Sequence, residues 1–118
     1  MRIGVLAART GVSVRSLRYY ETQGLLVSSR TGGGHREYED SAVDRVILIQ
    51  ELLAAGLTSA VIVQLLPCIY SGTTTPSMVK RLDQQRDLLD RRARELLATR
   101  DRLDDLIIEA RHRLASHQ

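Results

Sequence analysis

The segment IGVLAARTGVSVRSLRYYETQGLL, residues 3–26, contains the strongest local signals of the chain. It begins with an apolar helical pattern that Thr10-Gly11 interrupts. Ser13 is a typical N-cap for a second helix, because its hydroxyl can accept a bond from a free backbone N–H of the first turn. Gly24 is expected to end that helix, since glycine adopts a left-handed conformation without steric cost. The segment therefore predicts two short helices joined by a tight turn.

The second predicted helix has a polar outer face. Val14 and Leu17 are expected to point toward the core. The exposed face then carries Arg15, Ser16, Arg18 and Tyr19. Two helices across a tight turn, with arginines on the second, form the helix-turn-helix pattern that inserts a recognition helix into the DNA major groove. Arginine binds both guanine and phosphate, and the sequence does not distinguish these two contacts.

A short hairpin is predicted after the second helix. Residues 25–27 (LLV) are apolar like a strand, residues 31–34 (TGGG) have the composition of a turn, and residues 35–38 (HREY) alternate like a returning strand. Such a hairpin converts the motif into a winged helix-turn-helix, in which the wing brings cations to the phosphate backbone.

The order of these elements, with LRYYETQGLL at 17–26, R-x5-R-E-Y at 30–38 and AGLT at 55–58, resembles the MerR family of bacterial transcription activators. The resemblance implies a homodimer that binds a pseudo-palindromic site in an over-long promoter spacer. It also implies activation by bending and untwisting of that spacer, so that RNA polymerase recognises both promoter elements. The signal that would trigger this step is not identified by the sequence.

The resemblance also indicates which wing residues lie near the DNA. Arg30 and Arg36 match the arginines that the family places near the backbone, and His35 stands where relatives usually have tyrosine. A histidine can still donate a hydrogen bond to phosphate. Tyr19 or Tyr20 is a candidate hydroxyl donor to phosphate, with core packing under the wing as an equal alternative for Tyr20. Tyr38, at the end of the predicted wing, is expected to pack the wing against the head.

The charge distribution agrees with a DNA-binding head. The formal net charge is +3, and residues 1–38 contain two acids, Glu21 and Glu37. Against these stand six arginines, at positions 2, 9, 15, 18, 30 and 36. A general excess of arginine in the chain is the alternative explanation, but it does not account for the local scarcity of acids.

Two further helices are expected to complete the head, which spans residues 1–70. Asp40 or Ser41 is expected to cap the first of them, and Thr58 the second. Pro67 is expected to end the second helix.

Polar and turn-forming residues 71–77 (SGTTTPS) predict a hinge, and residues 78–118 predict one long helix. The apolar positions of this helix recur every seven residues and include Leu82, Leu89, Leu96, Leu103 and Ile107. A lone helix would leave this stripe in water, and the head is too small to cover it if the helix folded back. The stripe therefore predicts a dimer seam, which the resemblance makes an antiparallel coiled coil. The predicted fold is mainly α.

Chemical motifs point away from an enzyme and away from a cofactor. No glycine loop precedes a lysine-bearing helix, and no nucleophile–base pair is recognisable. The single cysteine, Cys68, does not supply the ligand set of a soft-metal or iron–sulfur site, so neither a metal nor another cofactor is expected. A buried structural thiol is the favoured interpretation of Cys68, and a thiol sensor is the alternative. No effector domain is expected after the coiled coil, so a small-molecule effector would bind within the dimer.

The sequence contains neither a long apolar run nor a secretory leader, and its lone cysteine fits a reducing compartment. We therefore expect a cytoplasmic, nucleoid-associated bacterial protein that has no membrane partner. The runner-up function is an architectural DNA-binding protein without an effector switch, which would lack the long helix of residues 78–114. A coiled-coil interaction module is a third interpretation, and the retained arginines of the head oppose it.

Overall fold

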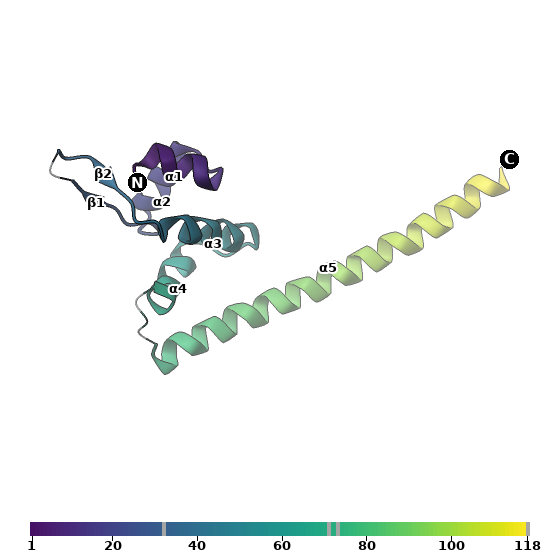
Figure 1. The fold of residues 1–118 in the computed structure, drawn as a ribbon. Helices are drawn as coiled ribbons and strands as arrows, with labels where there is room; N and C mark the ends of the chain where they lie inside the picture. Colours follow the sequence, from purple (N-terminus) through teal and green to yellow (C-terminus); the bar gives the residue numbers. More distant parts are fainter. Residues whose placement is uncertain (32, 71, 73, 118) are drawn as a thin grey trace. The chain divides into compact units, whose positions relative to one another are not determined.

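The computed structural model describes residues 1–31, 33–70, 72 and 74–117, and the side chains of residues 68–70 lie outside that description. Contacts divide the chain into two units, Met1–Met78, which contains the head, and Val79–Gln118. The elements are α1 (Ile3–Thr10), α2 (Val14–Thr22), β1 (Ser29–Arg30), β2 (Arg36–Glu37), α3 (Ala42–Ala54), α4 (Ser59–Tyr70) and α5 (Pro76–Ser116) (Figure 1). The predicted mainly helical fold with a small wing and a long last helix is confirmed.

The two helices of the helix-turn-helix have the ends that the sequence predicts. Gly11 follows α1 with a φ of 74°. The Ser13 hydroxyl accepts a 3.1 Å bond from the Ser16 N–H and so caps α2. At the other end of α2, Gly24 has a φ of 77°, and the Leu25 N–H donates back to the Tyr20 carbonyl over 2.9 Å. This is a Schellman ending, which turns the chain sharply toward the wing.

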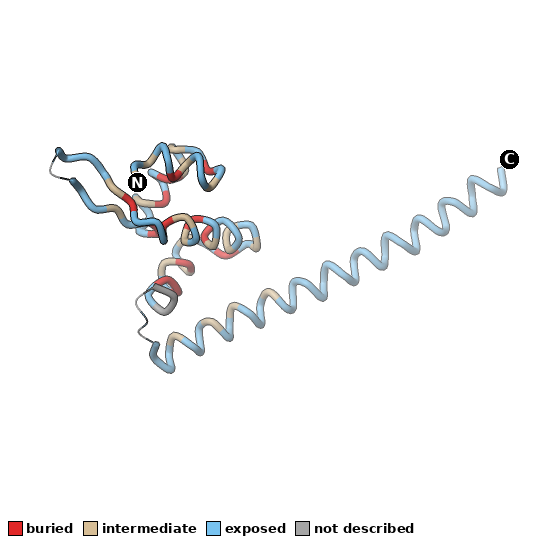
Figure 2. The backbone as a smooth tube through the Cα atoms, in the orientation of Figure 1, coloured by how far each residue is buried: buried red, intermediate tan, exposed pale blue. Residues whose placement is uncertain are grey.

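The core of the head is formed where α1 packs on α2 and α3, and where α3 packs on α4. Each of the helices α1 to α4 contributes at least one fully buried aliphatic side chain (Figure 2). These side chains are Leu6, Leu17, Val46, Ile49 and Ile62. Burial of one such side chain stabilises a fold by about 1.5–3 kcal/mol. The recognition helix is therefore held by an aliphatic core on its inner face, and its outer face stays available.

The wing begins later in the chain than predicted. Its two-residue strands pair antiparallel, with Ser29 opposite Glu37 and Arg30 opposite Arg36. The prediction of a strand at residues 25–27 is wrong, because Leu25 and Leu26 are buried in the core directly after the end of α2. The apolar run reflects burial of a connecting segment, and the strand itself is polar.

The start of α3 also differs from the prediction. Ser41 occupies the N-cap position but makes no capping bond, and its hydroxyl instead donates to Glu39 over 3.4 Å. The Asp40 carboxylate lies 3.7 Å from the guanidinium of Arg9 on α1. Ser41 and Asp40 therefore interact with neighbouring side chains and do not cap α3. Backbone hydrogen bonds close the first turn of the helix.

In α4 the predicted cap is present and the predicted end is wrong. The Thr58 hydroxyl accepts a 3.2 Å bond from the Val61 N–H. The helix continues through Pro67 to Tyr70. Proline removes one backbone donor and crowds the preceding turn. The missing donor removes one bond of the helical ladder, to the carbonyl four residues earlier, and the helix continues past it.

The long helix α5 starts two residues earlier than predicted. The Thr75 hydroxyl accepts a 3.2 Å bond from the Met78 N–H, and Pro76 takes the first helical position, where its missing donor is harmless. Pro76 and Ser77, which we predicted in the hinge, therefore belong to the helix. Ser71 and Thr73 of that predicted hinge lie outside the described residues.

No described side chain of α5 is buried (Figure 2). Leu82 and Leu89 are half-buried, and the remaining predicted seam residues, Leu96, Leu103 and Ile107, are exposed. The ion pairs Arg94–Asp90 and Arg113–Glu109, at 3.3 and 2.7 Å, join residues one turn apart. The later part of the apolar stripe is thus exposed, and its antiparallel pairing remains a prediction. Among the described helices we find none with the length and apolarity needed to cross a membrane.

Candidate DNA-binding surface

The recognition helix α2 presents a polar face. Arg15, Arg18 and Tyr19 are exposed there, as the sequence predicts. Ser16 is half-buried, and its hydroxyl accepts a 3.0 Å bond from the Ser13 hydroxyl. The cap of the helix therefore occupies Ser16, while the two arginines and Tyr19 are accessible to a ligand.

Tyr20 lies on the opposite side of α2. Its side chain is 8% exposed and belongs to the aliphatic core of the head. This burial agrees with the alternative in which Tyr20 packs under the wing. A hydroxyl contact between Tyr20 and phosphate remains a prediction.

Five arginines of the recognition helix, the wing and α1 differ in their acidic partners. Within the described part of the chain, no carboxylate lies within ion-pair distance of Arg15, Arg18 or Arg30. By contrast, Arg9 faces Asp40 and Arg36 faces Glu21. Arg15, Arg18 and Arg30 can therefore pair with an anionic ligand, whereas Arg9 and Arg36 already have an internal counter-ion.

Glu21, near the end of α2, joins the recognition helix to the wing. One of its oxygens, Oε2, lies 2.6 Å from Nη1 of Arg36 on β2. The other, Oε1, accepts a 3.0 Å bond from the hydroxyl of Tyr38. The ring of Tyr38 is 2% exposed, which confirms that it packs the wing against the head. Burial raises the pKa of Tyr38, and the hydrogen bond to Glu21 and the negative charge of Glu21 raise it further.

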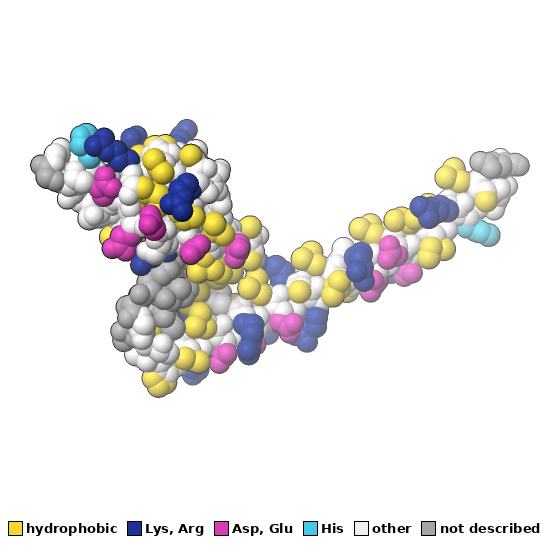
Figure 3. Space-filling model, in the orientation of Figure 1, with side chains coloured by type: hydrophobic (Ala, Val, Ile, Leu, Met, Phe, Trp, Pro, Cys, Tyr) yellow, Lys and Arg dark blue, Asp and Glu magenta, His cyan; other side chains and the backbone are white. Residues whose placement is uncertain are grey.

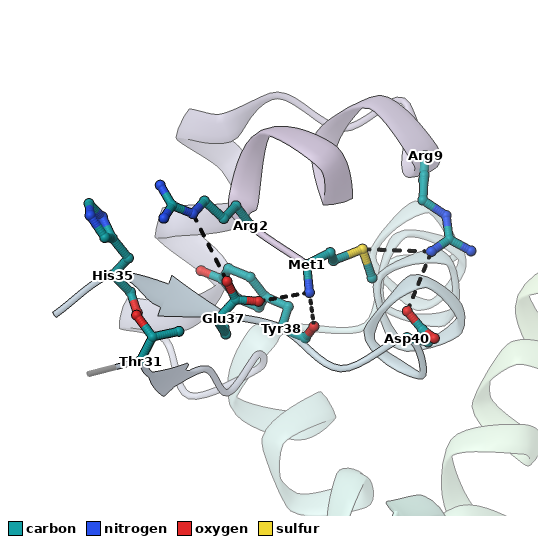
Figure 4. A network of polar contacts seen from close by, with 8 residues as sticks. All are labelled: Met1, Arg2, Arg9, Thr31, His35, Glu37, Tyr38 and Asp40. Atoms are coloured by element: carbon teal, nitrogen blue, oxygen red, sulfur yellow. Dashed lines mark hydrogen bonds and ion pairs between the residues drawn. The ribbon is translucent and has the colours of Figure 1, made fainter. Parts of the chain in front are cut away.

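The wing is also tied to the start of the chain (Figure 4). The ammonium of Met1 lies 3.0 Å from a Glu37 oxygen and donates a 2.7 Å bond to the Tyr38 carbonyl. The Tyr38 N–H in turn donates to the Met1 carbonyl over 2.7 Å. Arg2 contributes a longer ion pair, with 4.0 Å between its Nε and Glu37. These contacts fix the base of the wing beside α1.

A groove of about 540 Å³ lies between the wing, α1 and α2. It is lined by Arg2, Ile3, Arg18, Gly34, His35 and Arg36. Figure 4 shows the side chains of Arg2 and His35 extending to the same side of the wing. In the face shown in Figure 3, the histidine of the wing lies beside dark blue cationic side chains along one edge of the head. The groove therefore gathers the side chains of Arg2, Arg18, His35 and Arg36, each of which can donate to an oxyanion.

The structure brings together three predicted site residues in this groove, Arg18, His35 and Arg36, and adds Arg2. Arg2 was counted in the positive head but was not among the predicted contact residues. Arg30 is paired opposite Arg36 in the wing and does not line the groove. Arg36, which we predicted beside the phosphate backbone, is already held by Glu21 at 2.6 Å.

The side chain of Cys68 lies outside the described part of the structure, so both interpretations of this thiol remain predictions. Over the residues that are described, no group of three or more histidine, cysteine and acidic side chains is placed to hold a metal ion.

The sequence of the chain is similar to those of known transcription regulators. The model of the family described as MerR HTH family regulatory protein matches residues 1–68. Nodulation protein NolA of Bradyrhizobium elkanii is 39% identical over 106 residues, which cover 89% of this chain and 46% of that protein. A SoxR homolog of Chromobacterium violaceum, an HTH-type transcriptional activator, is 37% identical, with coverage of 89% and 72%. The chain thus spans about half of the length of the nodulation protein and most of the SoxR homolog.

The fold is found in solved structures as well. A MerR family transcriptional regulator from Listeria monocytogenes superposes with a TM-score of 0.81 and 27% sequence identity. The match covers 91% of this chain and 83% of the other.

Proposed function

The chain belongs to the MerR family of helix-turn-helix regulatory proteins, and on this premise we propose that it is a sequence-specific DNA-binding transcription regulator. The observation that carries the proposal is the polar face of α2 beside the wing. There Arg15 and Arg18 face solvent with no carboxylate partner among the described residues, next to a groove lined by further cations. Phosphate contacts give such a surface its affinity, and base contacts from α2 give it specificity.

The proposed active form is a homodimer joined through α5. Support comes from the exposed seam residues, because a leucine stripe of this length is stable in water only when another apolar surface covers it. A second copy offers a self-complementary stripe, and the antiparallel arrangement would place one head at each end of the coiled coil. Two heads related by a two-fold axis match a pseudo-palindromic operator.

The proposed regulatory step is bending and untwisting of promoter DNA so that RNA polymerase recognises both promoter elements. Part of the specificity would then arise from base pairs that the protein never touches, because their deformation energy depends on sequence. The signal would be a small-molecule effector bound in the dimer or a thiol reaction at Cys68.

The test begins with a duplex selected by the protein itself from a random-sequence library. Arg18→Ala is expected to weaken binding to this duplex by about 1–3 kcal/mol and to relax specificity at one position. Arg9→Ala is the matched control, because Arg9 is an exposed arginine of the head that already pairs with Asp40. We expect this control to stay within about 0.5 kcal/mol of the parent. Equal affinity of the parent for heparin, unselected duplex and selected duplex would contradict sequence-specific recognition.

Transcription in vitro then tests the regulatory step. Promoters carrying the selected site in spacers of normal and increased length are transcribed with and without the protein. The proposal predicts activation of the promoter with the longer spacer. Specific binding that leaves transcription unchanged at every spacer length would instead indicate the architectural role.

A further inference from the structure

Glu21 is a carboxylate at the edge of a surface that we propose for DNA. A negative charge in such a position repels phosphate unless another group neutralises it. The Glu21 side chain is 16% exposed, and both of its oxygens are occupied, one by Arg36 and one by Tyr38. The Glu21 carboxylate therefore faces the wing, where Arg36 neutralises its charge.

Arg36 keeps donors for a ligand despite this pairing. A guanidinium has five N–H groups in a planar fork, and the 2.6 Å contact to Glu21 is made by Nη1. The Arg36 side chain remains 42% exposed and lines the groove with Arg18 and His35. The carboxylate can thus hold one edge of the guanidinium while another edge faces the groove.

The wing needs such a connection because its own pairing is small. Two strands of two residues each cannot fix their orientation by the ladder alone. Glu21 belongs to the last turn of the recognition helix, so its bonds to Arg36 and Tyr38 transmit the position of that helix to β2 and the residue after it. Glu21 thus fixes Arg36 relative to Arg18 of the same helix, in addition to the Met1 and Arg2 contacts that hold the base of the wing.

We propose that Glu21 is a positioning residue for DNA binding, which holds Arg36 and Tyr38 so that the groove side chains Arg18, His35 and Arg36 converge on one backbone phosphate. This inference rests on the proposed DNA-binding function. It leads to a result opposite to that expected from net charge, because removal of this acid should weaken binding to a polyanion.

The experiment compares Glu21→Gln, Arg36→Gln and the double variant in the full-length protein. Glutamine keeps an oxygen acceptor for Tyr38 but loses the charge that holds Arg36. The probe is the fluorescently labelled duplex selected by the parent, titrated over a series of salt concentrations. Asp44→Asn is the matched control, since it removes one acid from an exposed site in the first turn of α3.

We expect each single variant to bind about tenfold more weakly than the parent, and the double variant to stay within about twofold of Arg36→Gln alone. The slope of log affinity against log salt should fall by about 0.9 per head for Glu21→Gln. Asp44→Asn should bind as tightly as the parent or slightly more tightly. A Glu21→Gln variant that behaves like this control would overturn the inference, and so would singles whose losses multiply in the double variant.

Folding is monitored by circular dichroism for every variant. Glu21→Asp is measured in parallel, because it keeps the charge and withdraws the carboxylate from Arg36 by one methylene. It should also bind more weakly, and full affinity of this variant would count against positioning. A parent that fails to bind duplex DNA would refute both the proposed function and this inference. A parent that binds, with Glu21→Gln unimpaired, would refute the inference alone.

Discussion

Tyr38→Phe removes the hydroxyl that donates to Glu21 and also contacts Ser28 at the base of the wing, and it leaves the buried ring in place. A hydrogen bond to a charged acceptor contributes about 1.5–3 kcal/mol. Glu21 retains its 2.6 Å contact with Arg36 in the variant, so the carboxylate is not left without a partner. We therefore expect a loss at the low end of that range, about 1.5 kcal/mol. For a domain of this size, the loss corresponds to a decrease of about 6–12 °C in the midpoint of thermal unfolding.

The tyrosines provide an assay that reports on the head alone. The chain has four tyrosines and neither tryptophan nor phenylalanine, and all four precede α5 in the sequence. Near-ultraviolet circular dichroism of tyrosine therefore follows unfolding of the head without a contribution from the long helix. Three of the four reporters remain in Tyr38→Phe.

The pH dependence gives a second, independent readout. Burial and the bond to Glu21 raise the folded pKa of Tyr38 above its ordinary value of 10.0. A raised pKa stabilises the protonated form, so the contribution is fully present below pH 10 and is lost as the pH rises through the folded pKa. The parent should lose stability in this alkaline range more steeply than Tyr38→Phe.

Two results would refute the reasoning about Tyr38. One is a variant as stable as the parent at neutral pH, which would mean that the bond to Glu21 contributes nothing. The other is an identical alkaline loss in parent and variant, which would assign the loss to different groups.

Three further changes test other parts of the molecule. Replacing Leu89 and Leu96 together by aspartate buries unpaired charge in the proposed seam and should give monomers in sedimentation, whereas a persistent dimer would exclude that seam. Gly24→Ala should lower the free energy of unfolding of the head, measured by urea denaturation, by about 1 kcal/mol. Backbone strain at a φ of 77° is the cause, because an added Cβ meets no atom within 4 Å. Cys68→Ser should leave promoter output under diamide, peroxide and soft-metal challenge unchanged, and loss of a response seen in the parent would identify Cys68 as the sensor.

Local signals predicted much of the fold. The cap at Ser13 and the helix end at Gly24 depend on neighbouring residues and backbone conformation, so the sequence alone located both. The first wing strand was misplaced, because two residues are too few to show an alternating pattern, whereas the returning strand predicted at residues 35–38 contains β2. Pro67 was assigned too strong an effect, since a proline removes one backbone donor and does not by itself end a helix.

The least predictable part of the site is the connection between Glu21 and Arg36. These residues are fifteen positions apart, and their contact exists only because the chain reverses in the wing. A weak signal was present in the sequence, where Glu21 is one of two acids among the arginines of residues 1–38. The scarcity of acids in this region showed that Glu21 was unusual. The fold of the wing was needed to show that Glu21 binds Arg36.

The exposed apolar stripe of α5 has a consequence for how the protein responds to its own concentration. The head has an internal core, so its folding is a unimolecular process. In α5 no described side chain is buried, so burial of side chains contributes little to the stability of that helix in an isolated chain. Melting of the helical signal should therefore shift to higher temperature as the protein is concentrated, while melting of the tyrosine signal should stay constant. At low protein concentration, many chains would therefore have a folded head but would not be paired in a dimer.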